Sequence, residues 1–334
     1  MARPPTDPPQ HPVPPAVGDR RPWTDVPTAL RDGLEQALGA AVTGAVSCAG
    51  GFSPGVAAGL QLTDGRRVFV KAVGAEPNAY APQLHRREAR VAPALPSCVP
   101  SPRLLTALDD RGWVVLAFEW VDGTMPAQPW RAAELDRVLH AVAHLATATT
   151  PAPPTVAAVV PVAAESLAEE FRGWRNLTHQ RNAGLPLDGL DPWAAARLDA
   201  LAELESGWPD AVRGDALAHC DLRADNVLLT RERVFLVDWA RACLAAPWLD
   251  LLFLLAPAPL HGGPSPESAF AAHPAAAGAD PAEVTVVLTA LTGMLVDRSR
   301  RPPPPGIPTL RRFQAAQARA ALAWLRHRRL PRHM

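Results

Sequence analysis

The sequence predicts an α+β fold in two parts, a small strand-rich part followed by a larger and mainly helical part. Two observations support this prediction. Short runs rich in β-branched and aromatic residues, separated by glycine-containing turns, extend from about residue 42 to 120, and apolar residues at helical spacing dominate after residue 123. The 334 residues are 48% hydrophobic, which is enough to bury a sizeable core. Two such parts commonly hold a ligand in the cleft between them.

The chain is predicted to begin with a disordered, proline-rich tail, residues 1–22. Residues 1–20 contain seven prolines and few large apolar residues, so they cannot bury enough surface to offset the loss of chain entropy on folding. The pattern changes at Trp23, because apolar side chains occur at helical spacing in residues 24–42. We therefore expect ordered structure from residue 23.

Residues 23–120 are predicted to form the strand-rich part. The dipeptide Asp64-Gly65 is a hairpin signal between the second and third strand patterns. One helix pattern, residues 79–95, is inserted after the third strand. The strand patterns, in chain order, are residues 42–51, 55–63, 66–73, 103–110 and 112–120.

Residues 121–334 are predicted to form the helical part. One hairpin interrupts it at residues 226–239, with a turn near Arg231-Glu232. Proline-rich connectors separate the helix patterns. These patterns are residues 131–149, 162–180, 191–206, 246–256, 281–298 and 309–329.

Composition argues against several partners. The formal net charge is zero, so no global field attracts nucleic acid or a membrane surface. No apolar segment reaches 18 residues, the length that a membrane-spanning helix needs. The four cysteines are scattered without a C-x-x-C pair, which predicts neither a disulfide framework nor a zinc site. We expect a cytoplasmic protein with no nucleic-acid or membrane partner and leave its oligomeric state open.

Lys71 is the only lysine among 33 basic residues. It lies on the predicted strand that follows "AGGFSPGVAAGL", a loop of small residues whose backbone N–H groups could approach phosphate oxygens. Glu88, seventeen residues later on the inserted helix, could hold the lysine ammonium. The alternatives are a plain glycine-rich hairpin and a surface lysine left by codon bias.

A second constellation, "HCDLRADNVLL", contains Asp221 and Asn226 in a loop that runs into a hydrophobic strand. The predicted hairpin returns Asp238, in "VFLVDWA", close to Asn226. A carboxylate and an amide oxygen are hard ligands suited to Mg²⁺, which leaves Asp221 to face an acceptor.

With these residues identified, positions 45–330 resemble the aminoglycoside phosphotransferase-type family of small-molecule kinases, relatives of choline kinases and of eukaryotic protein kinases. The resemblance implies a protein-kinase-like two-lobe fold. Residues 23–120 would form the nucleotide-binding N-lobe, and residues 121–334 the C-lobe with the catalytic loop and the acceptor site.

The resemblance also implies roles for single residues. Lys71 would bind ATP phosphates and be held by Glu88, Asp221 would be the catalytic base, and Asn226 and Asp238 would bind Mg²⁺.

Further roles follow from the same resemblance. Gly51 and Ser53 would belong to the phosphate loop, while "VLAFEWVDG" resembles the interlobe linker, where Glu119 to Val121 would offer backbone groups to adenine. His219 would be a buried residue that fixes the loop, and Asp250 would support the catalytic loop.

The length of the segment after Asp238 distinguishes small-molecule kinases from protein kinases. Only twelve residues divide it from Asp250, too few for the activation segment of a protein kinase, so the acceptor is expected to be a hydroxyl of a small molecule. Two departures stand out: Cys220 occupies a position where the family usually has glycine, and residues 245–247 replace Gly-Asp-Pro. Cys220 could be a nucleophile or a packed structural cysteine.

An aminoglycoside acceptor is less favoured than a metabolite or natural product. A polycation requires a strongly acidic pocket, and the available acids occur at helix spacings typical of solvated faces: Glu165, Glu169, Glu170, Glu203 and Glu205. A nucleotide-binding pseudokinase and an interaction module without turnover remain as alternatives, although the complete Lys, Glu, Asp, Asn and Asp set favours an enzyme.

Overall fold

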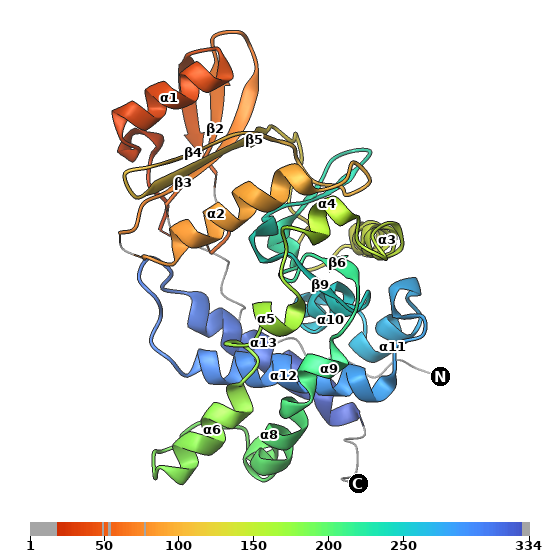
Figure 1. Ribbon diagram of the computed structural model, residues 1–334. Coiled ribbons are helices and arrows are strands. Elements are labelled where there is room, and N and C mark those ends of the chain that lie inside the picture. The colour runs from red at the N-terminus through yellow and green to blue at the C-terminus, as the bar shows by residue number, and fades with distance from the viewer. Residues whose placement is uncertain (1–18, 49, 53–54, 77, 329–334) are drawn as a thin grey trace.

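The computed structural model describes residues 19–48, 50–52, 55–76 and 78–328. Its strand-rich part is one antiparallel sheet of five strands in the order β1-β2-β3-β5-β4 (Figure 1). The strands are β1 (Val42–Ser47), β2 (Val56–Leu62), β3 (Arg67–Val73), β4 (Leu104–Asp110) and β5 (Trp113–Glu119). All five predicted strands and the Asp64-Gly65 hairpin are therefore confirmed.

Each face of the sheet packs against a different helix. Lys71 lies opposite Ala57 on β2 and Leu116 on β5, so these three side chains share one face. The helix α2 (Ala81–Val91) packs on this face and lies between the sheet and the helical lobe (Figure 1). The helix α1 (Thr28–Leu38) packs on the opposite face, whose alternating residues form a separate apolar cluster.

The helical lobe buries a larger core around Trp174, Phe171 and Trp239. Its long helices match the predicted ones closely: α3 (Ala132–Ala148), α12 (Pro281–Ser299) and α13 (Leu310–His327). Among the described residues, none of the helices combines the length and apolar character needed to cross a membrane. The shorter helices are α4 (Pro154–Ala157), α5 (Ala163–Ser166), α6 (Gly173–Asn182), α7 (Pro192–Ala195), α8 (Leu198–Ser206), α9 (Trp208–Ala211), α10 (Leu249–Leu255) and α11 (Pro266–Ala271).

The predicted helix 162–180 was wrong, because the chain forms α5 and α6 instead. A Cβ atom at Gly173 would lie 2.0 Å from the Gly293 carbonyl oxygen, so α6 begins where its backbone touches α12. The carboxylate of Glu205 accepts the N–H groups of Trp174 and Arg175 at 3.0 Å each. This acid caps α6 from thirty residues away, which no local pattern announces.

Two short antiparallel strand pairs flank the loop 219–226. β7 (Val227–Leu229) and β8 (Val234–Leu236) form the predicted hairpin. β6 (Ala216–Ala218) and β9 (Cys243–Ala245) form a second antiparallel pair that the sequence analysis missed. The loop 219–226 connects these two pairs.

The predicted tail boundary at residue 22 differs from the structure. The N–H of Asp19 donates to the Gly306 carbonyl at 2.8 Å, and the N–H of Arg21 donates to the Gly55 carbonyl at 3.0 Å. Arg20 and Gly55 form a parallel bridge. Residues 19–22 are therefore bonded to both lobes, because a few polar residues gain backbone partners that composition does not reveal. Residues 1–18 lie outside the described part.

Candidate active site

Lys71 lies at the centre of a partly buried cluster with two carboxylates, of which Glu88 is buried and Asp238 is 41% exposed. Its Nζ is 2.6 Å from Oε2 and 2.8 Å from Oε1 of Glu88, and 3.2 Å from Oδ1 of Asp238. Glu88 shares the buried face of α2 with Ala81 and His85, at the spacing of successive helical turns. The structure thus brings together three predicted site residues from β3, α2 and the end of β8.

The charges in this cluster depend on one another. Burial alone would lower the pKa of Lys71, but the carboxylates of Asp238 and Glu88 outweigh it and the pKa is raised. Burial raises the pKa of Glu88, and Lys71 only partly offsets that effect. Burial would raise the pKa of Asp238, but Lys71 and the neighbouring histidines His85 and His219 together lower it well below its usual range. Lys71 is therefore a charged group that lies between two acids, of which Asp238 holds its proton less tightly than Glu88.

Asp250 holds the start of the loop 219–226, which the resemblance identifies as the catalytic loop. Its Oδ2 accepts the N–H of His219 at 2.7 Å, and its Oδ1 accepts the N–H of Cys220 at 2.9 Å. The ring Nε2 of His219 lies 2.8 Å from the carbonyl oxygen of Val237. These contacts tie the start of the loop to α10 and to the residue before Asp238.

Cys220 adopts a backbone conformation that usually favours glycine, with φ of 62°. Its side chain is buried, and a hydrogen bond with Cys243 together with burial raises the thiol pKa well above its usual value. A neutral, enclosed thiol is a poor nucleophile. The packed structural cysteine is the alternative that the structure favours.

Asp221 pairs with Arg223, two residues later in the same loop. The side-chain amide of Asn226 donates to the carbonyl oxygen of Asp221 at 2.8 Å, which fixes the loop around the carboxylate. Burial raises the pKa of Asp221, and the positive charges of Arg223 and Arg241 only partly offset it. Asp221 is therefore a carboxylate that is more basic than an ordinary exposed aspartate.

Asn226 and Asp238 come together as the hairpin predicted. The N–H of Val237 donates to the Asn226 carbonyl at 3.0 Å, so the residue before Asp238 is bonded directly to Asn226. Asp238 itself has φ of 72°, a left-handed conformation that aspartate tolerates better than most residues. One carboxylate and one amide oxygen fit Mg²⁺, which binds few protein groups and completes its shell with water and phosphates. Consistent with that sparse donor set, the described residues contain no cluster of three or more His, Cys, Asp or Glu that could hold a metal.

Four other residues were predicted to contact the nucleotide: Gly51, Ser53, Glu119 and Val121. Gly51 lies in the β1–β2 loop with φ of 77°, and Ser53 falls outside the described residues. The N–H of Glu119 donates to the Arg103 carbonyl at 2.9 Å, so an adenine contact at Glu119 would have to use its carbonyl oxygen. Val121 lies in the connection between β5 and Thr124, which pairs with Leu229 of the C-lobe.

Several residues at the site were missed by sequence reasoning. Arg223 bridges Asp221 and Asp225, with its Nε 3.0 Å from Asp225 Oδ1. In a second group, Arg241 and Arg298 both pair with Glu170. The Oε1 atom of Glu170 lies 2.6 Å from Nη1 of Arg241 and 3.2 Å from Nη2 of Arg298. Arg223 was present in the quoted motif, but the Glu170 pairs join residues too distant in sequence for a local pattern.

The chain belongs to the phosphotransferase enzyme family, whose model matches residues 58–287, more than half of its length. This membership confirms the family that the motifs suggested and the predicted class of enzyme, a phosphotransferase. Among curated protein sequences, none is significantly similar to the chain.

Solved structures show the same fold. A complex of aminoglycoside phosphotransferase APH(4)-Ia with ADP and hygromycin B has a TM-score of 0.58 at 15% identity, covering 90% of this chain and 98% of that one. A choline/ethanolamine kinase family protein from Mesorhizobium loti gives 0.57 at 18% identity, with 89% and 98% covered. Choline kinase LicA from Streptococcus pneumoniae gives 0.55 at 13% identity, with 88% and 98% covered. The predicted protein-kinase-like two-lobe fold is therefore confirmed.

Proposed function

We propose that the protein transfers the γ-phosphate of MgATP to a hydroxyl group of a small molecule. The observation that carries the proposal is the cluster in which Lys71 contacts both Glu88 and Asp238. Such a cluster places one fixed cation beside one carboxylate that is free to take part in metal binding. Phosphoryl transfer needs this kind of positioning and charge neutralisation more than covalent chemistry.

Each residue has a defined task in this reaction. Lys71 binds phosphate oxygens as a compact point charge and is oriented by Glu88. Asn226 and Asp238 would hold Mg²⁺, which supplies charge neutralisation to the phosphates. Asp221, whose pKa is raised mainly by burial, accepts the proton of the acceptor hydroxyl.

The acids considered for a polycationic acceptor support a different substrate. Glu205 is buried as the cap of α6, and Glu170 is already paired with two arginines. Glu165 and Glu169 are exposed on the surface, as the helix spacing predicted, whereas Glu170 and Glu205 are not. Among the described residues these acids form no strongly acidic wall beside Asp221, so we favour a neutral or anionic hydroxylated metabolite or natural product over an aminoglycoside.

A shallow hollow lined by Arg223 and Asp225, in the loop that contains Asp221, is the candidate contact point for the acceptor. Its volume of about 20 Å³ is little more than one water molecule needs, so the acceptor would contact its rim and would not fit inside it. Arg223 and Asp225 line it on the catalytic-loop side, while the aromatic rings of Trp130 and Phe313 line it with His261 on the helical side. Aromatic walls and a charged edge suit a small acceptor that has both a ring or aliphatic face and polar groups.

The single lysine permits a direct test of the nucleotide site. An acyl-phosphate derivative of ATP should label one internal peptide, the one that contains Lys71, because binding holds its acyl group near the ammonium at high effective concentration. Excess MgATP should suppress the labelling. Mass spectrometry of digested protein reads the result without a known acceptor.

The variant Lys71→Arg tests whether the site needs only the positive charge of Lys71 or also the compact shape of its ammonium group. Lys71→Arg keeps the positive charge but replaces a compact ammonium with a planar fork. We expect this variant to fold and to lose most turnover in a screen of MgATP consumption with pooled hydroxylated metabolites. Labelling that MgATP does not suppress, or wild-type turnover by Lys71→Arg, would contradict the proposal.

A further inference from the structure

We propose that Arg241 and Arg298, which share the acid Glu170, form an arginine subsite that binds an anionic group of the acceptor, either a carboxylate or a phosphate ester. The enzyme would then select acidic hydroxylated molecules. This inference rests on the proposed function, because it concerns the molecule that receives the phosphate from MgATP. It deepens that function by naming the charge that the acceptor carries.

The arginine subsite has one more guanidinium group than it has acids. Both arginines contact the same Oε1 atom of Glu170, at 2.6 Å for Arg241 and 3.2 Å for Arg298. Within the part of the chain that the structure describes, Glu170 is the only side chain that forms an ion pair with either of them. A guanidinium has five N–H donors in a planar fork, so both arginines keep donors for a second anion.

The arginine subsite is open enough for a ligand to reach it. The side chain of Arg241 is 22% exposed and that of Arg298 is 27% exposed, while Glu170 is 13% exposed. Because these groups are partly shielded from water, a charge contact made here is stronger than one made on the open surface. A partly shielded guanidinium that exceeds its acids in number favours a bound anion.

The pairing of β6 with β9 brings Arg241 close to the loop that contains Asp221. In this antiparallel pair, Ala218 lies opposite Cys243. Asp221 follows Ala218 by three residues and Arg241 precedes Cys243 by two, so both lie at the same end of the strand pair. Burial would lower the pKa of Arg241, but the carboxylates of Glu170 and Asp221 outweigh burial and raise it.

Contacts of the residues before Arg241 hold the chain at the same place. The carbonyl oxygen of Val237 lies 2.8 Å from Nε2 of His219, two residues before Asp221. The centroid of the Trp239 ring lies 4.7 Å from that of the His219 ring. The chain is therefore fixed beside the start of the loop 219–226 both before and after Arg241.

The helices α12 and α13 place Arg298 at the end of the helical lobe that also carries the acceptor hollow. Arg298 lies in the last turn of α12, and the two helices run antiparallel, because Nε of Arg328 at the far end donates to Oγ1 of Thr285 at 2.9 Å. Phe313, the fourth residue of α13, lines the hollow that we propose as a contact point for the acceptor. The hollow and Arg298 therefore lie at the same end of this helix pair.

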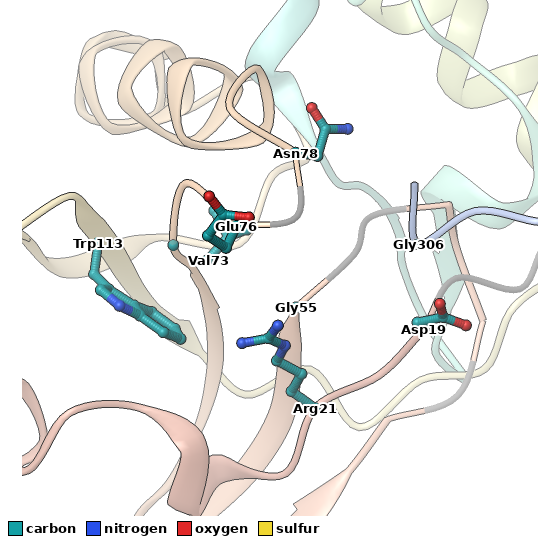
Figure 2. A pocket seen from close by; sticks show the side chains of 9 residues that line it. Asp19, Arg21, Gly55, Val73, Glu76, Asn78, Trp113 and Gly306 are labelled. Carbon is teal, nitrogen blue, oxygen red and sulfur yellow. The ribbon is translucent and has the colours of Figure 1, made fainter. Parts of the chain in front are cut away.

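A cavity in the N-lobe beside Arg21 has the opposite charge balance. Its volume is about 220 Å³, and Arg21 lines it together with two acids, Asp19 and Glu76 (Figure 2). A surplus acid disfavours a bound anion, whereas the surplus guanidinium of the arginine subsite favours one. Arg21 is therefore a suitable control for anion binding elsewhere on the protein.

The first test is calorimetric titration of sodium sulfate, an anion without a hydroxyl group, into full-length wild type and variants at constant ionic strength. Arg298→Gln removes the surplus guanidinium and should weaken sulfate binding about tenfold, as loss of a charge-assisted contact does. Arg298→Lys keeps the charge and should recover part of this loss. Glu170→Gln removes the acid that competes for both arginines and should tighten sulfate binding.

Two control variants remove an arginine outside the arginine subsite. Arg172 forms a one-to-one pair with the exposed Glu169 at 3.0 Å, and Arg21 lines the N-lobe cavity. Arg172→Gln and Arg21→Gln should both bind sulfate within about twofold of wild type, because solvent and salt screen their charges from the subsite. Thermal unfolding checks that every variant is folded.

The second test uses turnover to identify the anionic group. MgATP consumption is measured with three pools of acceptors: hydroxy acids, phosphate esters that keep a free hydroxyl, and neutral polyols. Wild type should prefer one of the two anionic pools, which distinguishes a carboxylate from a phosphate. Arg298→Gln should raise KM for that pool about tenfold and leave kcat nearly unchanged, because the arginine subsite binds a part of the acceptor that does not react.

Other outcomes overturn the inference in distinct ways. Equal sulfate affinity of wild type and Arg298→Gln, or no sulfate binding by wild type, would mean that the arginine subsite binds no anion. Loss of sulfate binding in Arg21→Gln would place the anion in the N-lobe cavity. A loss of kcat without a rise in KM would assign Arg298 a structural role. If wild type binds MgATP but phosphorylates none of the pools, the proposed function fails, and the sulfate titration still decides whether the subsite binds an anion.

Discussion

Two partly buried ion clusters have opposite composition. In the first, one cation is shared by two acids: Lys71 contacts Glu88 and Asp238. In the second, one acid is shared by two cations: Glu170 contacts Arg241 and Arg298 through the same oxygen atom. The first cluster therefore has a surplus acid, with the pKa of Glu88 raised by burial to about 7, and the second has a surplus guanidinium.

This difference in composition indicates which charged or neutral groups can bind beside each cluster. A cluster with a surplus carboxylate suits a metal ion, because Asp238 can exchange part of its contact with Lys71 for a divalent cation. A cluster with a surplus guanidinium disfavours a polycation and tolerates an anionic or neutral group. The pKa of Asp221 responds to both clusters, because Arg241 of the second lowers it and Asp238 of the first raises it.

The largest expected effect comes from Asp221 itself. Asp221→Asn removes the proton acceptor while keeping the shape of the side chain, so kcat should fall by about 10² or more, and MgATP affinity should stay within a few-fold. Steady-state kinetics and nucleotide titration measure the two quantities separately. Near wild-type turnover by Asp221→Asn would remove the residue from its assigned role.

The metal-binding side is tested by comparing its two proposed ligands. Asp238→Ala should weaken Mg²⁺-dependent nucleotide binding at least about tenfold more than Asn226→Ala, because a carboxylate supplies charge and the amide supplies one neutral oxygen. Calorimetric titration of ATP with and without Mg²⁺ gives the comparison. Intact Mg²⁺-dependent binding in both variants would mean that neither residue is a ligand.

The cluster of Glu170, Arg241 and Arg298 should contribute more to the stability of the fold than to nucleotide binding. Glu170→Gln leaves Arg241 and Arg298 close together without their shared acid, and the free energy of unfolding should fall by about 2 kcal/mol. The matched control is Glu169→Gln, because the side chain of Glu169 is 87% exposed and its pair with Arg172 should contribute about 0.5 kcal/mol or less. Urea unfolding measures both, and equal effects would show that the Glu170 cluster carries no special stability.

The pH dependence of turnover tests how the clusters act on Asp221. An ordinary aspartate has a pKa of about 3.9. Because the pKa of Asp221 is raised, we expect Asp221 to become protonated, and kcat to fall, at a higher pH than that. The charge of Asp225 contributes to that rise, so Asp225→Asn should move the acidic limb of the kcat profile to lower pH. A limb that does not move, or that moves upward, would exclude this electrostatic explanation.

The sequence predicted which residues gather around Lys71 and Asn226 far better than it predicted their surroundings. Lys71, Glu88, Asp221, Asn226 and Asp238 could be found because strand and hairpin periodicity places them within short, recognisable motifs.

The Glu170 cluster, the Glu205 cap of α6 and the pairing of β6 with β9 could not be found in the same way. Each depends on a partner more than twenty residues away, and no local pattern encodes such a partner. The same reason explains why Asp19 and Arg20 were assigned to the tail: their partners are Gly306, Gly55 and Gly50.

The smallest expected effect defines where the ordered protein begins. Deleting residues 1–18 removes a proline-rich stretch whose composition predicts little burial, so melting temperature and MgATP affinity should match those of the full chain. Deleting residues 1–21 also removes the backbone bonds to Gly55 and Gly306 and should cost about 1–2 kcal/mol of stability, since each such bond contributes modestly. Thermal unfolding and MgATP titration of both deletions give the comparison. A shift of several degrees on deleting only residues 1–18 would show that the tail docks on the folded chain.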